Sequence, residues 1–196
     1  GVEVTFATHF LFGTYLLTEL LRPSLRVAAE RGREPRVVLV SSGGMYNTAF
    51  PGWSVAASVP EEEGGELPGY NGQLAYAYAK RGQVLLAERW AELEESRGGP
   101  RISFVSAHPG WTGTKAVLEA YGDSAKWLEP MRTTWQGAEG ICWLCAAAAK
   151  ELDPGAFYLD RETQAKHIAG PFMTEGWFTQ NSREDVDAML EQATRQ

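Results

Sequence analysis

Apolar residues recur at helical spacing in four stretches of the chain. The two long stretches, 2–31 and 74–95, each place leucines and aromatic residues on one helical face. Pro23 should kink or split the first of them, because proline removes a backbone donor from a helix interior. An alanine-rich apolar stretch, 136–150, and a polar stretch, 184–194, predict two further helices.

Short runs rich in valine, isoleucine and aromatic residues lie between these helices, at 36–40, 102–107 and 156–159. Continuous apolar runs of this length are typical of strands buried on both faces of a parallel sheet. The segment 43–73 predicts a loop, and 160–182 is irregular and aromatic. The alternation of helices and strands predicts βαβ units, so we expect an α/β fold whose ligands bind beyond the C-terminal ends of three parallel strands.

The composition is that of an ordinary globular chain. Of its 196 residues, 44% are hydrophobic and 22% are charged, which suits one domain or most of one with a sizeable core. The net charge of −7 argues against nucleic acid or an anionic membrane surface as a partner. No uninterrupted apolar run approaches the roughly 18 residues of a membrane span, so we expect no span in this part and a cytoplasmic location.

Two cysteines, Cys142 and Cys145, form a Cys-x-x-Cys pair within the alanine-rich helix. A redox dithiol or half of a metal site is one interpretation of this spacing. No second pair of cysteines or histidines stands at ligand spacing, so we expect no metal site and favour small apolar side chains packed in a helix. Reduced thiols suit a cytosolic protein.

A phenol and an ammonium one helical turn apart have the clearest chemical meaning. Tyr76 and Lys80 lie near the start of the second long helix and, four residues apart, share one face. A nearby cation stabilises a phenolate and should lower the pKa of Tyr76 from about 10. The strand 36–40 leads into Ser41 and Ser42, and a serine hydroxyl could hold a carbonyl or alcohol oxygen. These groups suffice for proton transfer to and from an alcohol oxygen.

The other half of a carbonyl–alcohol redox reaction requires a nucleotide cofactor that carries hydride. Its usual signal is a glycine-rich turn that follows a first strand and opens a helix, and no such segment occurs in this sequence. The chain opens with Gly1 rather than Met and continues directly into a helical pattern. We therefore interpret residues 1–196 as the C-terminal portion of a Rossmann-type doubly wound domain whose first βαβ half is missing.

Three segments, met in order along the chain, together resemble a known family. They are Val40-Ser41-Ser42-Gly43-Gly44 at a strand end, Tyr76-x-x-x-Lys80 in a helix, and Pro109-Gly110-Trp111-Thr112-Gly113-Thr114 after the next strand. This combination resembles the short-chain dehydrogenase/reductase (SDR) family, whose members are NAD(P)-dependent Rossmann proteins. The stretch 36–45 and the Asp160-Arg161 pair are similar to a narrower group, the relatives of dehydrogenase/reductase SDR family member 12.

The resemblance implies roles for the matching residues. Ser42, rather than Ser41, would hydrogen-bond the substrate oxygen. Tyr76 would be the general acid for reduction and the general base for oxidation. Lys80 would lower the pKa of Tyr76 and bind the ribose hydroxyls of the nicotinamide. Tyr78 is the competing phenol, but it lies on a different helix face, and we expect it to be a packing residue.

The resemblance also implies a cofactor, and the residues of the sequence indicate a substrate class. The cofactor would be NAD(P), with NADP favoured, and its binding residues would be Tyr76, Lys80, Pro109, Gly110, Thr112 and Thr114. The segment 160–196 would lie on the substrate side of the domain. The loop 43–73 and the aromatic residues Phe172, Trp177 and Phe178 would form apolar pocket walls, which suits a lipophilic carbonyl or alcohol. A homo-oligomer is compatible with the sequence.

One position of the family pattern differs in this chain. The family usually carries an Asn in the first helix, where it holds a water of the proton relay. One alignment of the helix places His9 at that position and another places Phe10 there. An imidazole both donates and accepts protons, so His9 could serve the relay, although it could equally be a hydrogen-bonded helix residue.

Two other classes of function remain open. The chain could be a non-catalytic, truncated SDR-like binding module. It could also be a hydrolase with Ser42 as nucleophile and His108 or His167 as base, but the Gly-x-Ser-x-Gly elbow of such enzymes is absent from the sequence. We therefore expect an NAD(P)-dependent oxidoreductase whose cofactor site is incomplete within residues 1–196.

Overall fold

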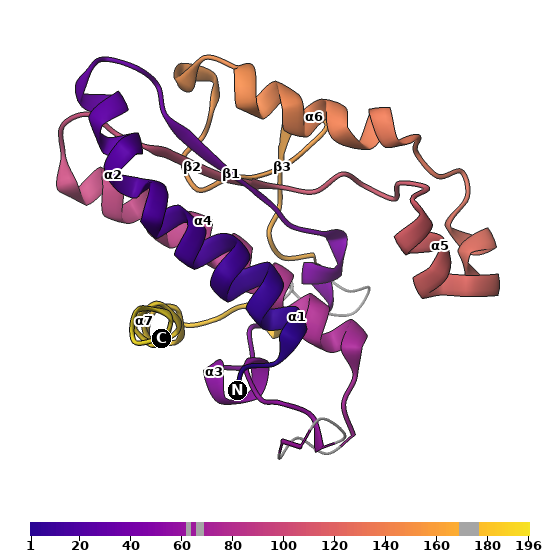
Figure 1. The fold of residues 1–196 in the computed structure, drawn as a ribbon. Helices are drawn as coiled ribbons and strands as arrows, with labels where there is room; N and C mark the ends of the chain where they lie inside the picture. Colours follow the sequence, from indigo (N-terminus) through magenta and orange to yellow (C-terminus); the bar gives the residue numbers. More distant parts are fainter. Residues whose placement is uncertain (62–63, 66–68, 169–176) are drawn as a thin grey trace.

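A mixed four-stranded sheet forms the centre of the protein, in a computed structural model that describes residues 1–61, 64–65, 69–168 and 177–196 (Figure 1). The strands are β1 (Arg36–Val40), β2 (Ser103–Ala107), β3 (Phe157–Leu159) and β4 (Glu162–Gln164), in that spatial order. β1 pairs with β2 and β2 with β3 in parallel, whereas β3 and β4 are antiparallel. The expected α/β fold with parallel strands is confirmed.

The fourth strand lies where the sequence analysis expected irregular structure, so that expectation was wrong for residues 162–164. A tight turn at Asp160 and Arg161 joins β3 to β4, and both residues have a positive φ, 54° and 67°. A two-residue hairpin of this kind usually has Asn or Gly at these positions. The sequence signal for the hairpin was therefore missing.

One face of the sheet is covered by two long helices. The first is continuous from Val4 to Glu30 and comprises α1 (Val4–Phe6), the π-helical segment η1 (Ala7–Leu16) and α2 (Leu17–Glu30). The second is α4 (Gly72–Arg97). The main core lies between these helices and the sheet, and it includes Phe6, Phe10, Leu39, Leu86, Trp90 and Phe104.

Proline does not split the first helix. Pro23 lies inside α2 on an exposed face, where water can solvate the carbonyl that loses its partner, and the helix continues to Glu30. The departure from α geometry lies upstream, in η1. A Cβ at Gly13 would approach the Thr8 carbonyl oxygen to 2.1 Å, so the wide π turn requires glycine there.

The opposite face of the sheet is covered by α6 (Thr134–Ala146), which ends four residues before the predicted boundary (Figure 1). Ile141 and Leu144 pack on Val105 and Tyr158 in a second core cluster. Both crossovers between parallel strands step in the same direction along the sheet, β1 to β2 and β2 to β3. Because α4 and α6 lie on opposite faces, the two crossovers have opposite hands, although nearly all such connections are right-handed.

The expectation that the cysteines pack inside a helix core was wrong. Cys142 and Cys145 are both free and exposed. The buried side of α6 is formed by Ile141 and Leu144, and each cysteine is one residue further on, about 100° around the helix.

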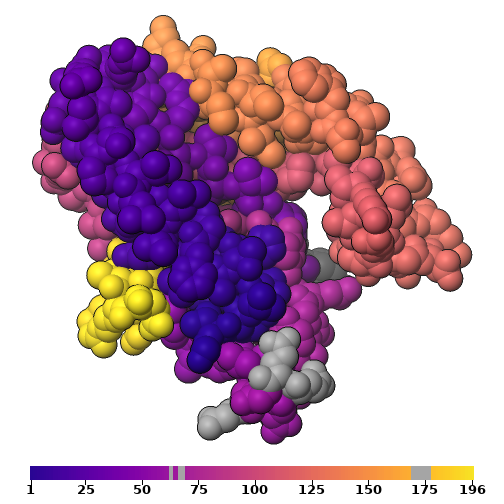
Figure 2. Space-filling model, viewed as in Figure 1, coloured from indigo at the N-terminus to yellow at the C-terminus, as the bar shows by residue number. Residues whose placement is uncertain are grey.

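Shorter elements complete the fold. They are η2 (Gly43–Asn47), α3 (Trp53–Ala56), α5 (Lys115–Tyr121), η4 (Gly122–Leu128), η5 (Ala149–Glu151), η6 (Trp177–Thr179) and α7 (Arg183–Thr194). The C-terminal helix α7 buries Val186 and Met189, which join the core cluster of α4. The segment with α5 and η4 projects from the body as an arm, and Figure 2 shows an opening between this arm and the body.

The helix from Val4 to Glu30 is long and apolar enough to cross a membrane, judged by length and composition alone. Counting uninterrupted apolar residues did not indicate this, because polar residues such as His9 and Glu19 interrupt the run. The core helix of a soluble protein passes the same test, and Phe6 and Phe10 of this helix are fully buried. Its outer face exposes a stripe of apolar residues: Val4, Phe12, Leu16, Leu17, Leu20, Leu21 and Val27.

Candidate active site

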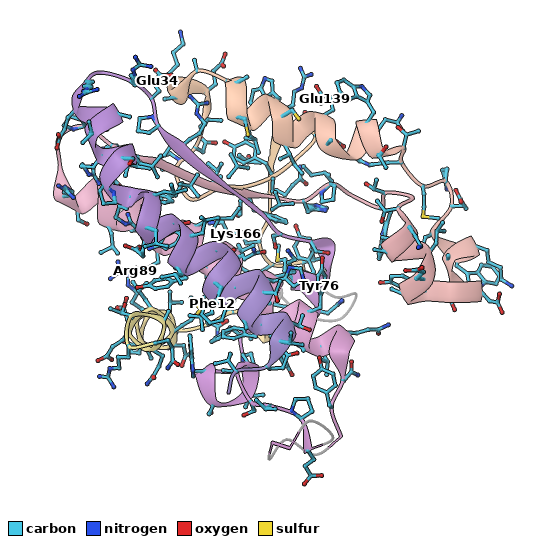
Figure 3. All side chains as sticks on the ribbon, in the orientation of Figure 1. Phe12, Glu34, Tyr76, Arg89, Glu139 and Lys166 are labelled. Carbon is cyan, nitrogen blue, oxygen red and sulfur yellow. The ribbon has the colours of Figure 1, made fainter. Side chains whose placement is uncertain are left out.

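The fold brings Ser42, Tyr76 and Lys80 together beyond the C-terminal end of β1. Figure 3 labels Tyr76 near the start of α4. The Ser42 side chain caps η2 by accepting a hydrogen bond from the Gly44 backbone N–H at 3.2 Å, and its hydroxyl lies close enough to the Tyr76 phenol to lower the pKa of that phenol. Tyr76 and Lys80 share one face of α4, and the Lys80 Nζ lies 5.3 Å from the centre of the Tyr76 ring. The three residues that the motifs suggested therefore form one cluster.

The two adjacent serines have different environments. The Ser41 hydroxyl is buried and donates to the Lys80 backbone carbonyl at 2.8 Å, which ties the end of β1 to α4. Ser42, one residue later, faces the phenol instead. Ser41 thus has a structural partner, whereas Ser42 is the serine placed to act together with Tyr76.

Burial controls the acidity of both titratable groups in this cluster. It raises the pKa of Tyr76 above its usual value, and the nearby Ser42 hydroxyl only partly opposes this effect. Burial also lowers the pKa of Lys80 from 10.5 to about 8. The sequence analysis expected Lys80 to lower the pKa of Tyr76. In the structure the net effect on the Tyr76 pKa is the reverse, because desolvation of the phenol is the largest influence.

His9 also lies at this cluster. Its ring meets that of Tyr76 edge to face, with 5.3 Å between the ring centres. Burial and the neighbouring Lys80 lower the pKa of His9, so the imidazole stays neutral at neutral pH and can both accept and donate a proton. Phe10, the alternative residue for the relay position, is fully buried in the core and stacks on Phe6. Of the two alignments, the geometry favours the one that places His9 beside the phenol.

The turn after β2 holds the other predicted residues. Gly110 has φ of +70°, a conformation that glycine adopts readily, and its N–H donates to His108 Nδ1 at 3.3 Å. The Thr112 hydroxyl donates to the Pro109 carbonyl at 3.2 Å. Thr114 caps α5 by accepting from a backbone N–H. This turn lies next to the turn that begins at Ser42, because a Cβ on Gly43 would lie 3.9 Å from His108 Nδ1.

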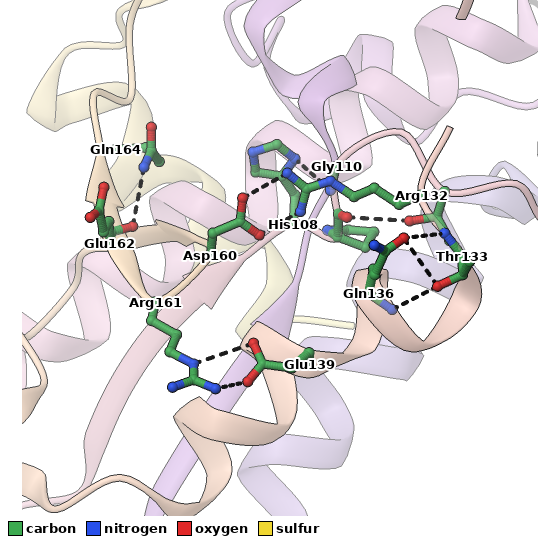
Figure 4. Close-up of polar contacts among 12 residues, drawn as sticks. His108, Gly110, Arg132, Thr133, Gln136, Glu139, Asp160, Arg161, Glu162 and Gln164 are labelled. Atoms are coloured by element: carbon green, nitrogen blue, oxygen red, sulfur yellow. Dashed lines mark hydrogen bonds and ion pairs between the residues drawn. The ribbon is translucent and has the colours of Figure 1, made fainter. Parts of the chain in front are cut away.

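An ion pair from a distant part of the chain braces this turn (Figure 4). Arg132 donates to both carboxylate oxygens of Asp160, one of them at 2.6 Å, and its backbone bonds Trp111 and Gly113. The guanidinium lies so close to the turn that a Cβ on Gly110 would approach Arg132 Nε to 2.7 Å. Sequence reasoning missed this role of Arg132, because the partners are 28 residues apart and only the Asp160-Arg161 pair carried any signal.

The residues around the two turns fit the nicotinamide end of a dinucleotide. The Lys80 ammonium is buried and donates to the Val40 carbonyl at 2.9 Å. Among the described residues this carbonyl is its one recorded acceptor, so N–H donors remain for a ribose hydroxyl. The glycine turn at 110 permits close approach of a planar ring to the backbone. Lys80 and the turn 109–114 could therefore hold that part of a cofactor.

Other sequence candidates have different surroundings. Tyr78 packs against the main core, as expected for a structural residue. His108 stacks on Phe157 and accepts from Gly110, and His167 bonds Arg81, so the nitrogen Nδ1 of each imidazole already has a partner other than Ser42. Of the predicted pocket walls, Phe178 is partly exposed, whereas Phe172 lies outside the described residues.

Comparison with known proteins identifies several relatives. Human dehydrogenase/reductase SDR family member 12 is 37% identical over 170 residues, which cover 86% of this chain and 48% of that protein. Mouse polyprenol dehydrogenase is 32% identical over 178 residues, covering 86% of this chain and 48% of its own length. The chain thus spans about half the length of the curated relatives it matches.

A solved structure also matches the fold. The crystal structure of an uncharacterized protein from Mycobacterium paratuberculosis aligns with a TM-score of 0.55 and 21% identity over 99% of this chain and 56% of its own. No family model matches the sequence.

Proposed function

Because this chain is related to the short-chain dehydrogenase/reductase family, we propose that it carries the proton-transfer groups and the nicotinamide side of an NAD(P)-dependent oxidoreductase. The reaction would interconvert a carbonyl compound and an alcohol. The contact of Ser42 with Tyr76, with the Lys80 ammonium over the same ring, is the observation that carries this proposal. These groups lie at the C-terminal edge of a parallel sheet, where α/β proteins bind ligands.

The roles of the side chains follow from their chemistry. A bound nicotinamide would supply or accept the hydride. Tyr76 keeps its proton at neutral pH because burial raises the pKa of its phenol, so it is ready to donate to a carbonyl oxygen. The Ser42 hydroxyl would hydrogen-bond the same oxygen. The Lys80 cation would stabilise the phenolate that remains and hold the ribose, and His9 would return a proton to Tyr76.

We infer a lipophilic substrate for this reaction. Large apolar side chains are exposed on the turn 109–114, which we call the cofactor turn, and on the arm that follows it: Trp111, Leu118 and Tyr121. The rings of Trp111 and Tyr121 meet edge to face, and the Tyr121 phenol is close enough to Tyr76 to influence its pKa. One relative is named for a polyprenol, which is a lipophilic alcohol.

The test uses the natural polypeptide that carries residues 1–196. Consumption of NADPH and NADH is followed by absorbance, with long-chain aldehydes and aromatic ketones as substrates and prenyl alcohols for the reverse direction. We expect turnover that Ser42→Ala reduces by at least about tenfold, since the serine orients the reacting oxygen. Binding of the reduced cofactor without turnover of any substrate would favour the non-catalytic binding module instead.

A further inference from the structure

Arg81, the residue that follows Lys80 on α4, is a fully buried cation. Burial lowers the pKa of its guanidinium to about 10, and Glu88 on the same helix opposes this effect. A buried charge is costly unless its donors are all satisfied. The partners of Arg81 therefore indicate what the residue contributes to the site.

All five N–H donors of the Arg81 guanidinium are used. Nε and one Nη2 donor bond the Thr179 carbonyl, the former at 3.1 Å. Nη1 donates to the Lys166 carbonyl at 2.8 Å and to the Met45 sulfur at 2.9 Å. The remaining Nη2 donor meets His167 Nδ1 at 2.6 Å. One side chain thus joins α4 to η2 and to two places in the C-terminal part of the chain.

We call residues 165–168 and 177–182 the strap. Besides Arg81, the strap bonds the segment that begins at Ser42: the Tyr46 hydroxyl donates to the Ala165 carbonyl at 2.6 Å. The Asn181 amide pairs with both backbone groups of Phe50 at 2.8 Å. Because Met45 and Tyr46 belong to η2, which Ser42 caps, the strap and the Ser42 turn are held as one unit.

The protonation state of His167 determines whether Arg81 keeps its hydrogen bond to this residue. A guanidinium only donates, so His167 Nδ1 must be unprotonated to accept from Arg81. The Thr179 hydroxyl also contacts this nitrogen, at 2.7 Å. A proton on Nδ1 would set a donor against a donor and a cation against a cation. Burial, Arg81 and Lys166 lower the pKa of His167, whereas Glu88 raises it.

Other charged groups face His167 across a shallow surface cavity. They are Glu88, Arg89 and Glu92 of α4 and Arg183 of α7. All four form ion pairs: Glu88 with Lys166, Arg89 with Glu92, and Arg183 with Glu92. Among the described residues, the Arg81 guanidinium is therefore the cation without a carboxylate partner that lies nearest to the imidazole.

We propose that Arg81 and His167 are positioning residues that clamp the strap onto the Ser42 turn and the Tyr76–Lys80 helix, and that protonation of His167 releases the clamp. The consequence for catalysis rests on the proposed oxidoreductase function. Release would displace the strap and the Ser42 turn, so it should weaken substrate binding more than it slows the chemical step.

Two substitutions at one position test the clamp. His167→Asn keeps an acceptor where Nδ1 lies but does not titrate, whereas His167→Leu removes the acceptor. In the natural polypeptide, KM should rise about tenfold as the pH falls through the titration of His167, the factor expected from loss of one hydrogen bond to a charged group. The Asn variant should have a pH-independent KM, and the Leu variant a raised KM at every pH. The kcat values should change less than KM in all three proteins.

A readout independent of turnover separates this proposal from the proposed function. Amide hydrogen exchange at Met45 and Thr179 should accelerate in His167→Leu, and in wild type at acid pH, relative to His167→Asn. Arg81→Lys, which keeps the charge but has three donors, should accelerate the same amides. If no substrate is turned over but the exchange pattern holds, the function is wrong and the clamp stands. Wild-type KM and wild-type exchange in the Leu variant would overturn the clamp.

Discussion

The buried ammonium of Lys80 should make the protein less stable at neutral pH than a variant that lacks it. Burial lowers the pKa of Lys80 from 10.5 to about 8, a difference that corresponds to a cost of about 3 kcal/mol for charging this lysine in the folded protein. Lys80→Met removes that cost but also the hydrogen bond to the Val40 carbonyl, worth about 2 kcal/mol while the donor is charged. We therefore expect Lys80→Met to stabilise the protein by about 1 kcal/mol at pH 7.

The stability difference between wild type and Lys80→Met should change with pH in a defined direction. Since the pKa is lower in the folded protein, the unfolded chain binds more protons at Lys80 between pH 8 and 10.5. The contribution of Lys80 to stability therefore improves as the pH rises through this window, and it is lost again as the pH falls toward 8. Wild type should approach Lys80→Met in stability with rising pH, and then exceed it by the value of the hydrogen bond.

Urea denaturation of wild type and Lys80→Met, at several pH values from 7 to about 10.5, measures the difference directly. Lys115→Met is the matched control, because the Lys115 side chain is 88% exposed and its loss should leave the pH profile unchanged. The same Lys80→Met protein should bind cofactor less tightly, since it lacks the ribose donor. A variant that is less stable than wild type at pH 7, with a difference that does not change with pH, would refute the reasoning.

Four further outcomes are expected. Tyr76→Phe should lower kcat by about 10²–10⁴-fold with cofactor affinity nearly unchanged, whereas Tyr78→Phe should change little; the reverse result would reassign the catalytic phenol. Gly137→Ala should cost about 1–3 kcal/mol of stability in thermal or urea unfolding, because its Cβ would lie 2.3 Å from Thr112 Oγ1. Asp160→Asn should weaken cofactor binding in a titration by releasing the guanidinium over the cofactor turn, while the melting temperature changes little. A protein of residues 1–196 should aggregate, because within the described part of the chain β1 pairs with β2 alone, and a cooperatively melting monomer would contradict this.

The elements with strong local patterns were predicted well. Neighbouring residues alone indicate β1 and β2, which are short apolar runs, and α4, which has a long stretch of helical periodicity. β4 was missed because its turn uses Asp160 and Arg161 in left-handed conformations. The sequence also did not indicate which face of the sheet α6 covers, because the rule of right-handed crossovers would place α6 on the same face as α4. The exposure of Cys142 follows from that placement and not from its own sequence context.

The candidate site divides in the same way. The proximity of Tyr76 and Lys80 follows from helix periodicity, and the nearness of Ser42 follows from the end of a parallel strand. The partners that brace the site come from far along the chain: Arg132 and Asp160 over the cofactor turn, and the strap around Arg81. Such pairs leave no periodic trace in the sequence. The direction of the Tyr76 pKa shift was missed because burial depends on tertiary packing.

The two adjacent buried cations, Lys80 and Arg81, differ in how many of their N–H donors the protein satisfies. Among the described residues Lys80 donates to one carbonyl, burial lowers its pKa to about 8, and at neutral pH its charge is a net cost that a bound ligand can offset. Arg81 has all five donors satisfied, so its charge organises the protein around it. A bound cofactor that accepts hydrogen bonds from Lys80 should therefore stabilise the folded protein, because these bonds offset the free-energy cost of burying the ammonium. The ligand-induced rise in melting temperature should therefore be smaller in Lys80→Met, which binds the cofactor less tightly, but should persist in the His167 variants.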